Sequence, residues 1–374
     1  MMTTPVAARP MSRSRRSLDQ GPSAFRIEPN DLMPRKSRVV ALCFWLPGLL
    51  VLVPGCARAP APLHLAGASM GTSWQVTAWA DQARKSELQM RLEARLQELN
   101  QQMSAWEPDS ALSRFNRAPA ATWVDFPPEL FEVVAHALEL AKLTDGAYDP
   151  TIAPLVDVWG FGSGTATRTS PPTAHEIQAA KARVGWQMLE LDRARHRAFQ
   201  TGTLKLDINS LGPGFAVDAL AGVLRNAGVE RFLVELGGEM RAGARKPDGS
   251  AWRIAIESPY TAAGADFDTV VELHHKALGT SGDYRAGFVH AGQRYSHTLD
   301  PRSGAPIQHD LAAVTVIADS AMAADARAAA LLVLGPDEGM AFARTHNLAA
   351  IFTLRTASGL TRQATPAFEF YRTQ

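Results

Sequence analysis

The feature that most restricts the fold of this chain is an alternation of amphipathic helices with short apolar strands between residues 63 and 354. Leucine and methionine recur at steps of three and four over Ser86–Met103, which predicts a helix that Ser86 can cap. The run Phe232–Leu236 has the length and composition of a strand. Alternation of this kind predicts a mixed α/β (α+β) class.

Similar patterns predict the other elements of the chain. Gly335-Pro336 separates the last two helices, and Gly160–Pro172 is expected to be a loop. The helices are expected over Pro128–Leu143, Thr173–Val184, Phe215–Ala227, Ala321–Leu334 and Asp337–His346. The strands are expected over 72–79, Trp252–Glu257, Val270–Leu273, Ala312–Ile317 and Ala349–Leu354.

The first part of the chain has the sequence pattern of a targeting segment. Basic residues at 34–38 precede an apolar run at 39–53, and Gly55-Cys56 follows. This pattern predicts a lipoprotein signal within an N-terminal extension over 1–55, with acyl chains on Cys56 anchoring the protein to a membrane. An ordinary secretory signal or a weak membrane helix with a chance cysteine is the alternative, and Met33 is an alternative start.

We expect a tether over 56–64 and one folded domain over 65–365. Both cysteines, Cys43 and Cys56, precede that domain, so no thiol chemistry is expected in it. The 38 Lys and Arg residues nearly balance the 37 Asp and Glu residues. A net charge of +1 gives no broad basic field, so no nucleic-acid partner is expected.

Several polar residues are candidates for chemistry. Asp207 ends a predicted short strand and precedes a turn into a helix, a position where ligands often meet α/β folds; a turn-forming aspartate is the alternative. His297 lies in the polar segment 295–304, which a hairpin around Gly292 can bring near Gly279–Tyr284. Asp325 interrupts an alanine-rich helix and needs a partner there, either Mg²⁺, an ion pair with Arg327, or solvent.

In their order along the chain, these segments resemble the ApbE family of FAD:protein FMN transferases. The resemblance covers roughly residues 65–355 and rests on long ungapped motifs. They are Met70-Gly71-Thr72, Met103–Asn116, Gly146–Gly162, Asp207–Asp218, Glu235–Glu239, Thr280–Tyr284, Tyr295–Gly304 and Ala324-Asp325.

The resemblance implies a T-fold-like bilobal domain that binds FAD and Mg²⁺. Such an enzyme cleaves the FAD diphosphate, transfers FMN to a Thr or Ser hydroxyl of a partner protein and releases AMP. The implied partner is a membrane redox complex of the sodium-pumping NADH:quinone reductase type, and the implied location is the periplasmic face of a bacterial membrane. An FAD pyrophosphatase that yields FMN and AMP, and a non-enzymatic flavin-binding lipoprotein, are the alternatives.

The resemblance also assigns roles to individual positions. His297 matches a histidine of the transfer step, and Asp300 is expected to orient that histidine or the neighbouring loop. The metal positions are Ser210, through its carbonyl, Asp325 and Ala329. The FAD-contact positions are Met70, Trp106, Ala147, Tyr148, Asp149, Asp207, Pro213 and Leu299.

This chain departs from the family pattern at three of these positions. Trp106 replaces a tyrosine, and its indole can still stack on a flat ring. Pro213 stands where relatives carry a polar side chain, so one polar contact is missing. Ala329 replaces a Thr or Ser one helical turn after Asp325, which removes one oxygen ligand and predicts a weaker affinity for Mg²⁺.

Overall fold

The computed structural model describes residues 61–373, apart from 164, 257–258, 260–268 and 285. The expected signal segment and the anchor at Cys56 therefore lie outside the described residues. The strand β1 begins at Leu63, two residues before the expected domain boundary. Within the described residues, no helix is both long enough and apolar enough to cross a membrane.

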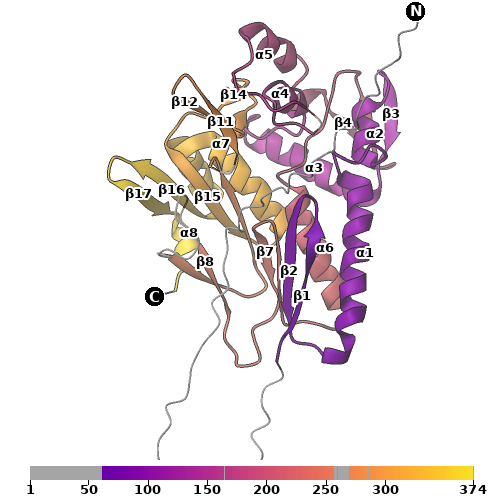
Figure 1. Ribbon diagram of the computed structural model, residues 1–374, viewed down its shortest axis with the longest axis vertical. Coiled ribbons are helices and arrows are strands. Elements are labelled where there is room, and N and C mark those ends of the chain that lie inside the picture. Colours follow the sequence, from indigo (N-terminus) through magenta and orange to yellow (C-terminus); the bar gives the residue numbers. More distant parts are fainter. Residues whose placement is uncertain (1–60, 164, 257–258, 260–268, 285, 374) are drawn as a thin grey trace, which may run out of the picture.

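An eight-stranded sheet forms the centre of the molecule, and every pair of neighbouring strands in it is antiparallel (Figure 1). Its hairpins place strands that are adjacent in sequence side by side, which antiparallel pairing permits. In spatial order the strands are β1 (Leu63–Ser69), β2 (Thr72–Ala78), β6 (Phe232–Leu236), β7 (Glu239–Ala242), β10 (Ala277–Gly282), β15 (Leu311–Ala318), β16 (Ala349–Thr356) and β17 (Gly359–Ala364).

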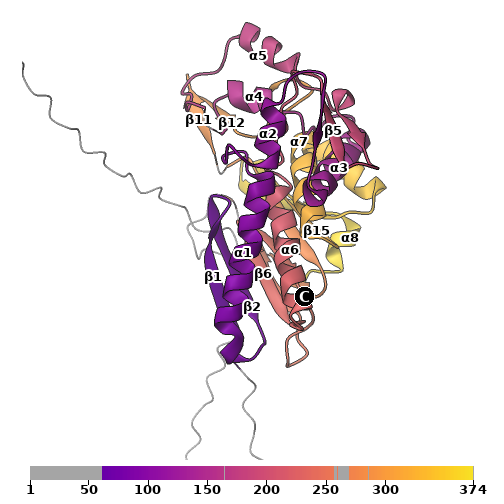
Figure 2. The same ribbon diagram turned by 90° about the vertical axis from the view of Figure 1, so that its right-hand side faces the viewer.

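The two faces of this sheet are covered differently because successive side chains point to opposite faces. Val234 packs among the helices, whereas Leu233 packs on the other side. The helical face carries α1 (Lys85–Met103), α6 (Gly212–Asn226) and α7 (Ala321–Thr345), and Figure 2 shows α1 and α6 side by side. The opposite face carries β8 (Trp252–Ile256), β9 (Thr269–Leu273) and α8 (Pro366–Glu369).

Smaller elements gather at one end of the sheet, uppermost in Figure 1. The Trp159 indole N–H donates to the Gly304 carbonyl (2.9 Å) and ties two of these segments together. The helices at this end are α2 (Ala111–Arg117), α3 (Pro128–Leu143), α4 (Ala153–Val158), α5 (Ala174–Lys181) and η2 (Trp186–Met188), whereas η1 (Gln82–Arg84) directly precedes α1 at the opposite end (Figure 1). The strands are β3 (Thr122–Asp125), β4 (Glu190–Asp192), β5 (Arg197–Gln200), β11 (Gly287–His290), β12 (Gln293–Ser296), β13 (Leu299–Asp300) and β14 (Ala305–Pro306).

Small residues let α6, α7 and β10 approach one another closely. A Cβ on Gly214 of α6 would lie 2.5 Å from the Ala321 carbonyl oxygen, and one on Gly279 of β10 would lie 2.6 Å from the Asp325 nitrogen. Neither position has room for a side chain, so the glycines and the alanine-rich composition of α7 are a packing requirement. This close packing brings the first turns of α6 and α7 to the same place.

The mixed α/β class is confirmed, and most predicted elements are present. The break predicted at Gly335 is also confirmed, since this residue has φ 83° inside α7. Three details are wrong. Ser86 does not cap α1, which starts at Lys85 directly after η1. The helix α6 starts at Gly212 rather than Phe215, and Asp207 follows an extended segment that pairs with no described strand.

Candidate functional site

A cavity of about 530 Å³ opens where the β1–β2 and β6–β7 turns meet the first turns of α6 and α7. This volume falls within the range of about 300–1,000 Å³ that is typical of small-molecule sites. Eleven of the thirteen predicted site residues line it, although they come from five separate stretches of the chain. They are Met70, Ala147, Tyr148, Asp149, Asp207, Ser210, Pro213, His297, Leu299, Asp325 and Ala329.

The floor of the cavity carries the carboxylate of Asp325, which is 5% exposed. The Gly214 N–H donates to this carboxylate (3.2 Å), and the glycine contacts between α6 and α7 are what allow that approach. Ala329 lies one helical turn further along α7 and also lines the cavity. Its methyl group supplies no oxygen, so the structure gives the predicted third metal position no ligand.

Tyr148 and Ser210 form a polar pair on the cavity wall, and their hydroxyl oxygens lie 3.1 Å apart. Burial raises the pKa of the Tyr148 phenol, the Ser210 hydrogen bond opposes this shift, and the charge of Asp325 adds to it. The phenol therefore stays protonated at neutral pH and can act as a hydrogen-bond donor, but not as a base.

Asp149 and Asp207 are carboxylates with different partners, and Asp149 is buried whereas Asp207 is half-buried. Asp149 accepts hydrogen bonds from the Thr151 N–H (2.8 Å) and hydroxyl (2.7 Å) and from the Trp186 N–H (2.9 Å), so its oxygens chiefly hold the local backbone. Asp207 accepts from the Asn209 N–H (2.8 Å). Burial raises the pKa of both carboxyls despite these hydrogen bonds.

The donors around Asp325 are compatible with a magnesium ion. Nowhere in the described part of the chain do three or more His, Cys, Asp or Glu side chains gather as a group that could hold a metal. Mg²⁺ does not need such a group, because it commonly binds one or two carboxylates together with water and substrate phosphates. A buried carboxylate lining a cavity, with Ser210 in the same lining, fits that chemistry.

His297 reaches the cavity from the other side, in the loop between β12 and β13. Its Nδ1 lies 3.2 Å from the Ala286 carbonyl oxygen, which can only accept a hydrogen bond. The hydrogen of the neutral ring is therefore on Nδ1, and Nε2 carries the lone pair. The ring edge meets Phe161 with centroids 6.5 Å apart, so the imidazole is held on two sides.

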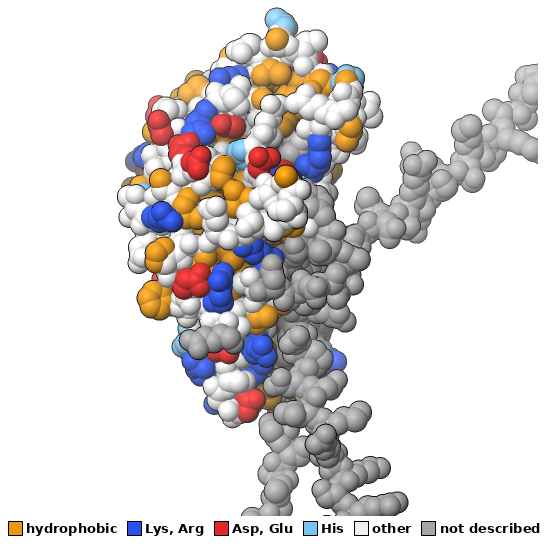
Figure 3. Space-filling model, turned by 90° about the vertical axis from the view of Figure 1, so that its left-hand side faces the viewer, with side chains coloured by type: hydrophobic (Ala, Val, Ile, Leu, Met, Phe, Trp, Pro, Cys, Tyr) orange, Lys and Arg blue, Asp and Glu red, His pale blue; other side chains and the backbone are white. Residues whose placement is uncertain are grey.

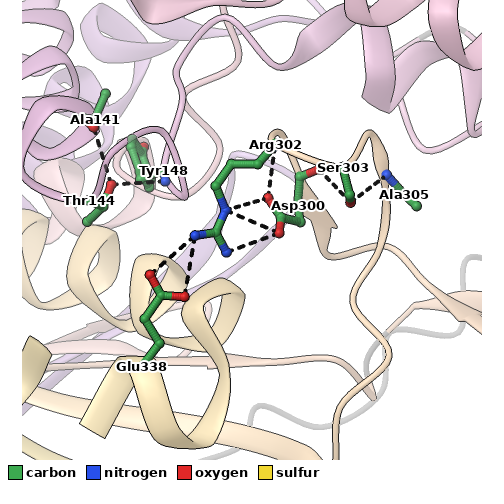
Figure 4. Close-up of polar contacts among 8 residues, drawn as sticks. All are labelled: Ala141, Thr144, Tyr148, Asp300, Arg302, Ser303, Ala305 and Glu338. Atoms are coloured by element: carbon green, nitrogen blue, oxygen red, sulfur yellow. Dashed lines mark hydrogen bonds and ion pairs between the residues drawn. The ribbon is translucent and has the colours of Figure 1, made fainter. Parts of the chain in front are cut away.

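Asp300 stabilises the loop that follows His297. Its carboxylate accepts from the Arg302 backbone N–H (2.8 Å) and forms an ion pair with the Arg302 guanidinium (3.1 Å), which also reaches Glu338 of α7 (Figure 4). The Ser303 hydroxyl donates to the Asp300 carbonyl (3.3 Å). Of the two roles expected for Asp300, these contacts support orientation of the loop.

Trp106 lies outside the residues that line the cavity and is 68% exposed. It follows α1 in a turn in which its N–H donates to the Ser104 hydroxyl (3.1 Å). An indole in this position can contact a ligand that extends beyond the cavity, so its role stays a prediction.

Two residues that contribute to the site were not singled out from the sequence. Asp218 of α6 accepts the first N–H groups of α7, those of Ala321 and Met322 (3.0 Å each), and so fixes the helix that carries Asp325. Glu239 is 6% exposed and lines the cavity directly after the β6–β7 turn. The signal for Asp218 was a charged residue inside an apolar helix, and that for Glu239 was a carboxylate directly after a glycine turn. Only long-range packing shows what each side chain faces.

The face of the molecule drawn in Figure 3 carries no single dominant charge. Figure 3 shows Lys and Arg side chains next to Asp and Glu side chains across one face of the molecule. This fits the near-balance of charges in the sequence. The fold and the cavity together define a class of protein: an α/β protein with a small-molecule site where buried carboxylates and a histidine from a separate loop face one cavity.

Comparison with known proteins narrows this class to one family. The model of the ApbE family matches residues 70–352. A curated FAD:protein FMN transferase of Vibrio cholerae is 36% identical over 330 residues, which cover 87% of this chain and 98% of the relative. The corresponding protein of Haemophilus influenzae is 35% identical, over 84% of this chain and 92% of its own length. This chain therefore belongs to the ApbE family.

Solved structures agree with this assignment. The flavin transferase ApbE from Vibrio cholerae matches with a TM-score of 0.75 at 34% identity, over 83% of this chain and 100% of the other. The apo form of the Pseudomonas stutzeri flavinyl transferase ApbE matches with a TM-score of 0.75 at 41% identity, over 83% and 96% of the two chains.

Proposed function

We propose that this protein is an FAD:protein FMN transferase that moves FMN from FAD to a Thr or Ser hydroxyl of an acceptor protein and releases AMP. The observation that carries the proposal is the cavity in which the buried carboxylate of Asp325 and the half-buried His297 face one space. Family membership supports the same conclusion, because the curated relatives carry this enzyme name.

Binding of FAD is supported by the lining of the cavity. Tyr148 and Ser210 supply hydroxyl groups, while Met70 and Leu299 supply apolar surface for a flat ring. The first turn of α6 opens at the same cavity, and the positive end of the helix dipole favours negatively charged phosphate groups there. Its N–H groups already have partners: that of Gly212 donates to the Ile208 carbonyl (2.8 Å) and that of Gly214 to Asp325 (3.2 Å). We therefore place the diphosphate near Pro213 and Asp325.

A magnesium ion, when bound, neutralises charge on the diphosphate, and we propose that the Asp325 carboxylate and the Ser210 carbonyl hold it. Ala329 leaves one ligand position to water or to another group. Asp325 is fixed for this task by the Gly214 N–H, and α7 is fixed by Asp218. The part of the site that faces the negatively charged diphosphate is therefore rigid.

In the transfer step we assign the role of base to His297. Nε2 accepts the proton of the acceptor hydroxyl while the hydroxyl oxygen bonds to the FMN phosphorus. The bond from that phosphorus to the AMP oxygen breaks, and AMP leaves with the electron pair. The proton on His297 then passes to the AMP phosphate or to water. The Ala286 carbonyl, at 3.2 Å from Nδ1, stabilises the imidazolium that forms in between.

The proposals for the protein partner and the location rest on the family resemblance and on the signal-like segment before Cys56, which lies outside the described residues. We propose an acceptor in a membrane redox complex of the sodium-pumping NADH:quinone reductase type. We also propose that a lipid on Cys56 holds the enzyme at the periplasmic face of the membrane. Replacing Cys56 with Ala should release active enzyme into the soluble fraction, and membrane retention of that variant would contradict the anchor.

The function is tested by incubating the purified protein with FAD, Mg²⁺ and an acceptor domain that bears the target Thr. We expect covalent flavin, seen as in-gel fluorescence of the acceptor, and one AMP for each FMN transferred. Free FMN and AMP without labelled acceptor would instead identify an FAD pyrophosphatase. Unchanged FAD would identify a non-enzymatic flavin-binding protein.

A further inference from the structure

A hairpin formed by β11 and β12 stands beside the cavity as a separate small sheet. Within the part of the chain that the structure describes, β11 pairs with β12 and with no other strand. Ala286, which precedes β11, and His297, which follows β12, both line the cavity. The open end of the hairpin is therefore at the cavity, and its turn points away from it.

The turn of this hairpin fixes which backbone groups face outward. Ala291 and Gly292 have φ values of 49° and 80°, so they form a two-residue turn of type I′. In such a hairpin the closing pair, here His290 and Gln293, is hydrogen-bonded. Bonded and non-bonded pairs then alternate along the two strands.

This alternation predicts that Ala286 and His297 form a hydrogen-bonded pair. The structure confirms it, because the His297 N–H donates to the Ala286 carbonyl (3.3 Å). Gly287 and Val289 fall at the intervening non-bonded positions. Their N–H and C=O groups therefore point away from β12, along the outer edge of β11.

Aromatic packing holds one face of the hairpin in place. Phe288 and Tyr295 stack as a cross-strand pair with ring centroids 5.2 Å apart, and Tyr295 also packs on Trp159 (5.7 Å). Gly287 is required for the close approach, because a Cβ there would lie 2.4 Å from the Tyr295 carbonyl oxygen.

Asp283 connects the hairpin to the main sheet. This residue is 6% exposed, and its carboxylate forms ion pairs with Arg355 of β16 and with Arg294 of β12 (3.5 Å). Its carbonyl accepts from the Ser296 hydroxyl (3.2 Å). The outer edge of β11 is therefore held in a fixed position before any partner binds, which reduces the entropy lost on binding.

The outer face of the hairpin is open to a partner. Val289 is 66% exposed, and Gly287 and His290 are exposed as well. Figure 3 shows hydrophobic side chains gathered at the upper end of one face, the end where Figure 1 places β11 and β12. An exposed strand edge is a ready template for pairing with another chain.

We propose that the acceptor protein docks on β11 by adding an extended segment to the edge formed by Ala286–His290. The chain of the acceptor then continues past Ala286 into the mouth of the cavity, where its Thr or Ser meets His297. Main-chain hydrogen bonds from Gly287 and Val289 supply the affinity, as in other cases of strand addition. This inference rests on the proposed function, since only a transferase to protein needs such a partner.

The edge is tested with two substitutions at one position. Val289→Pro removes an outward N–H without removing a hydrogen bond of the hairpin, and an edge strand tolerates proline. Loss of one hydrogen bond should raise the KM for the acceptor about tenfold, with FAD affinity unchanged. Val289→Ala keeps the N–H and should stay within about twofold of the wild type. An unchanged KM in the proline variant, or an equal rise in both variants, would overturn the proposal.

Hydrogen exchange on the wild-type enzyme gives a test that needs no variant. Adding the acceptor domain should slow exchange of the Gly287 and Val289 amides, and unchanged exchange there would overturn the docking site. The two proposals fail differently. If the wild type transfers no FMN, the proposed function is wrong. If it transfers FMN normally but the β11 amides are not protected from exchange, only the docking inference is wrong.

Discussion

The floor and the rim of the cavity are built in contrasting ways. At the floor, Asp325 and its neighbours lie between α6, α7 and β10, where glycine and alanine leave no free space. At the rim, His297 is only half-buried, in a loop attached to a two-stranded hairpin. The floor is fixed by packing of the main sheet, whereas the rim depends on a few hydrogen bonds and ring contacts.

This difference matches two tasks in the proposed reaction. Holding a highly charged diphosphate requires fixed groups in a site of low dielectric constant, which close packing provides. Accepting a large protein substrate requires an accessible edge, which only the rim can offer. Variants of the floor should therefore affect FAD and metal binding, whereas variants of the rim should affect transfer to the acceptor.

The largest effect is expected for Asp325→Asn at the floor. The amide keeps the shape of the side chain but removes the negative charge of the carboxylate that we propose as the metal ligand. Mg²⁺-dependent transfer should therefore fall by about three orders of magnitude. In-gel fluorescence measures the transfer, and binding of Mn²⁺ followed by electron paramagnetic resonance measures the metal. Undiminished activity would remove Asp325 from the metal site.

His297→Gln at the rim should lower the rate of transfer about 100-fold, because a positioned base typically contributes a factor of this size or more. FAD binding, measured by quenching of flavin fluorescence, should be unchanged, since the floor is intact. A variant that loses FAD affinity and keeps its transfer rate would reverse the division between floor and rim.

A gain at the floor is expected from Ala329→Thr. The new hydroxyl lies one turn after Asp325 on the cavity side of α7 and restores the missing oxygen. The Mg²⁺ concentration for half-maximal activity should fall, by about tenfold if the hydroxyl becomes a ligand. Ala329→Val, which has a similar shape without the oxygen, is the matched control. Equal half-saturation in the two variants would contradict the missing-ligand argument.

A smaller effect, on stability, is expected from Asp207→Asn. Burial raises the pKa of this carboxyl in the folded protein, so its ionised form destabilises the fold at pH values above about 3.9, the ordinary pKa of Asp. The Asn variant should therefore melt at a higher temperature than the wild type at pH 7, and the two melting temperatures should converge as the pH falls towards 4. A lower melting temperature of the Asn variant at pH 7 would show that other interactions in the folded wild type compensate the charge of Asp207.

Local signals in the sequence were sufficient for several elements. Thr173 and Glu176 form a capping box at the start of α5, and Gly335 breaks α7 where expected. The turn predicted at Gly292 is the turn of the β11–β12 hairpin. In each case the deciding interactions lie within a few residues, so the sequence alone reveals them.

Other features depend on distant contacts that no local pattern contains. The strand order of the sheet and the short strands β3, β4 and β5 follow from long-range pairing. The role of Asp218 is visible only once α7 packs against α6. Family resemblance supplied most of the cavity residues, but it gave no sign of the exposed position of Trp106 or of the open edge of β11.

The central claim is that a divalent cation at Asp325 lies against the diphosphate of bound FAD. A crystal soaked with FAD and Mn²⁺, with anomalous data collected for manganese, tests it directly. We predict a manganese peak about 2 Å from an Asp325 carboxylate oxygen and in contact with the diphosphate. A diphosphate bound elsewhere, or a peak distant from Asp325, would contradict the account.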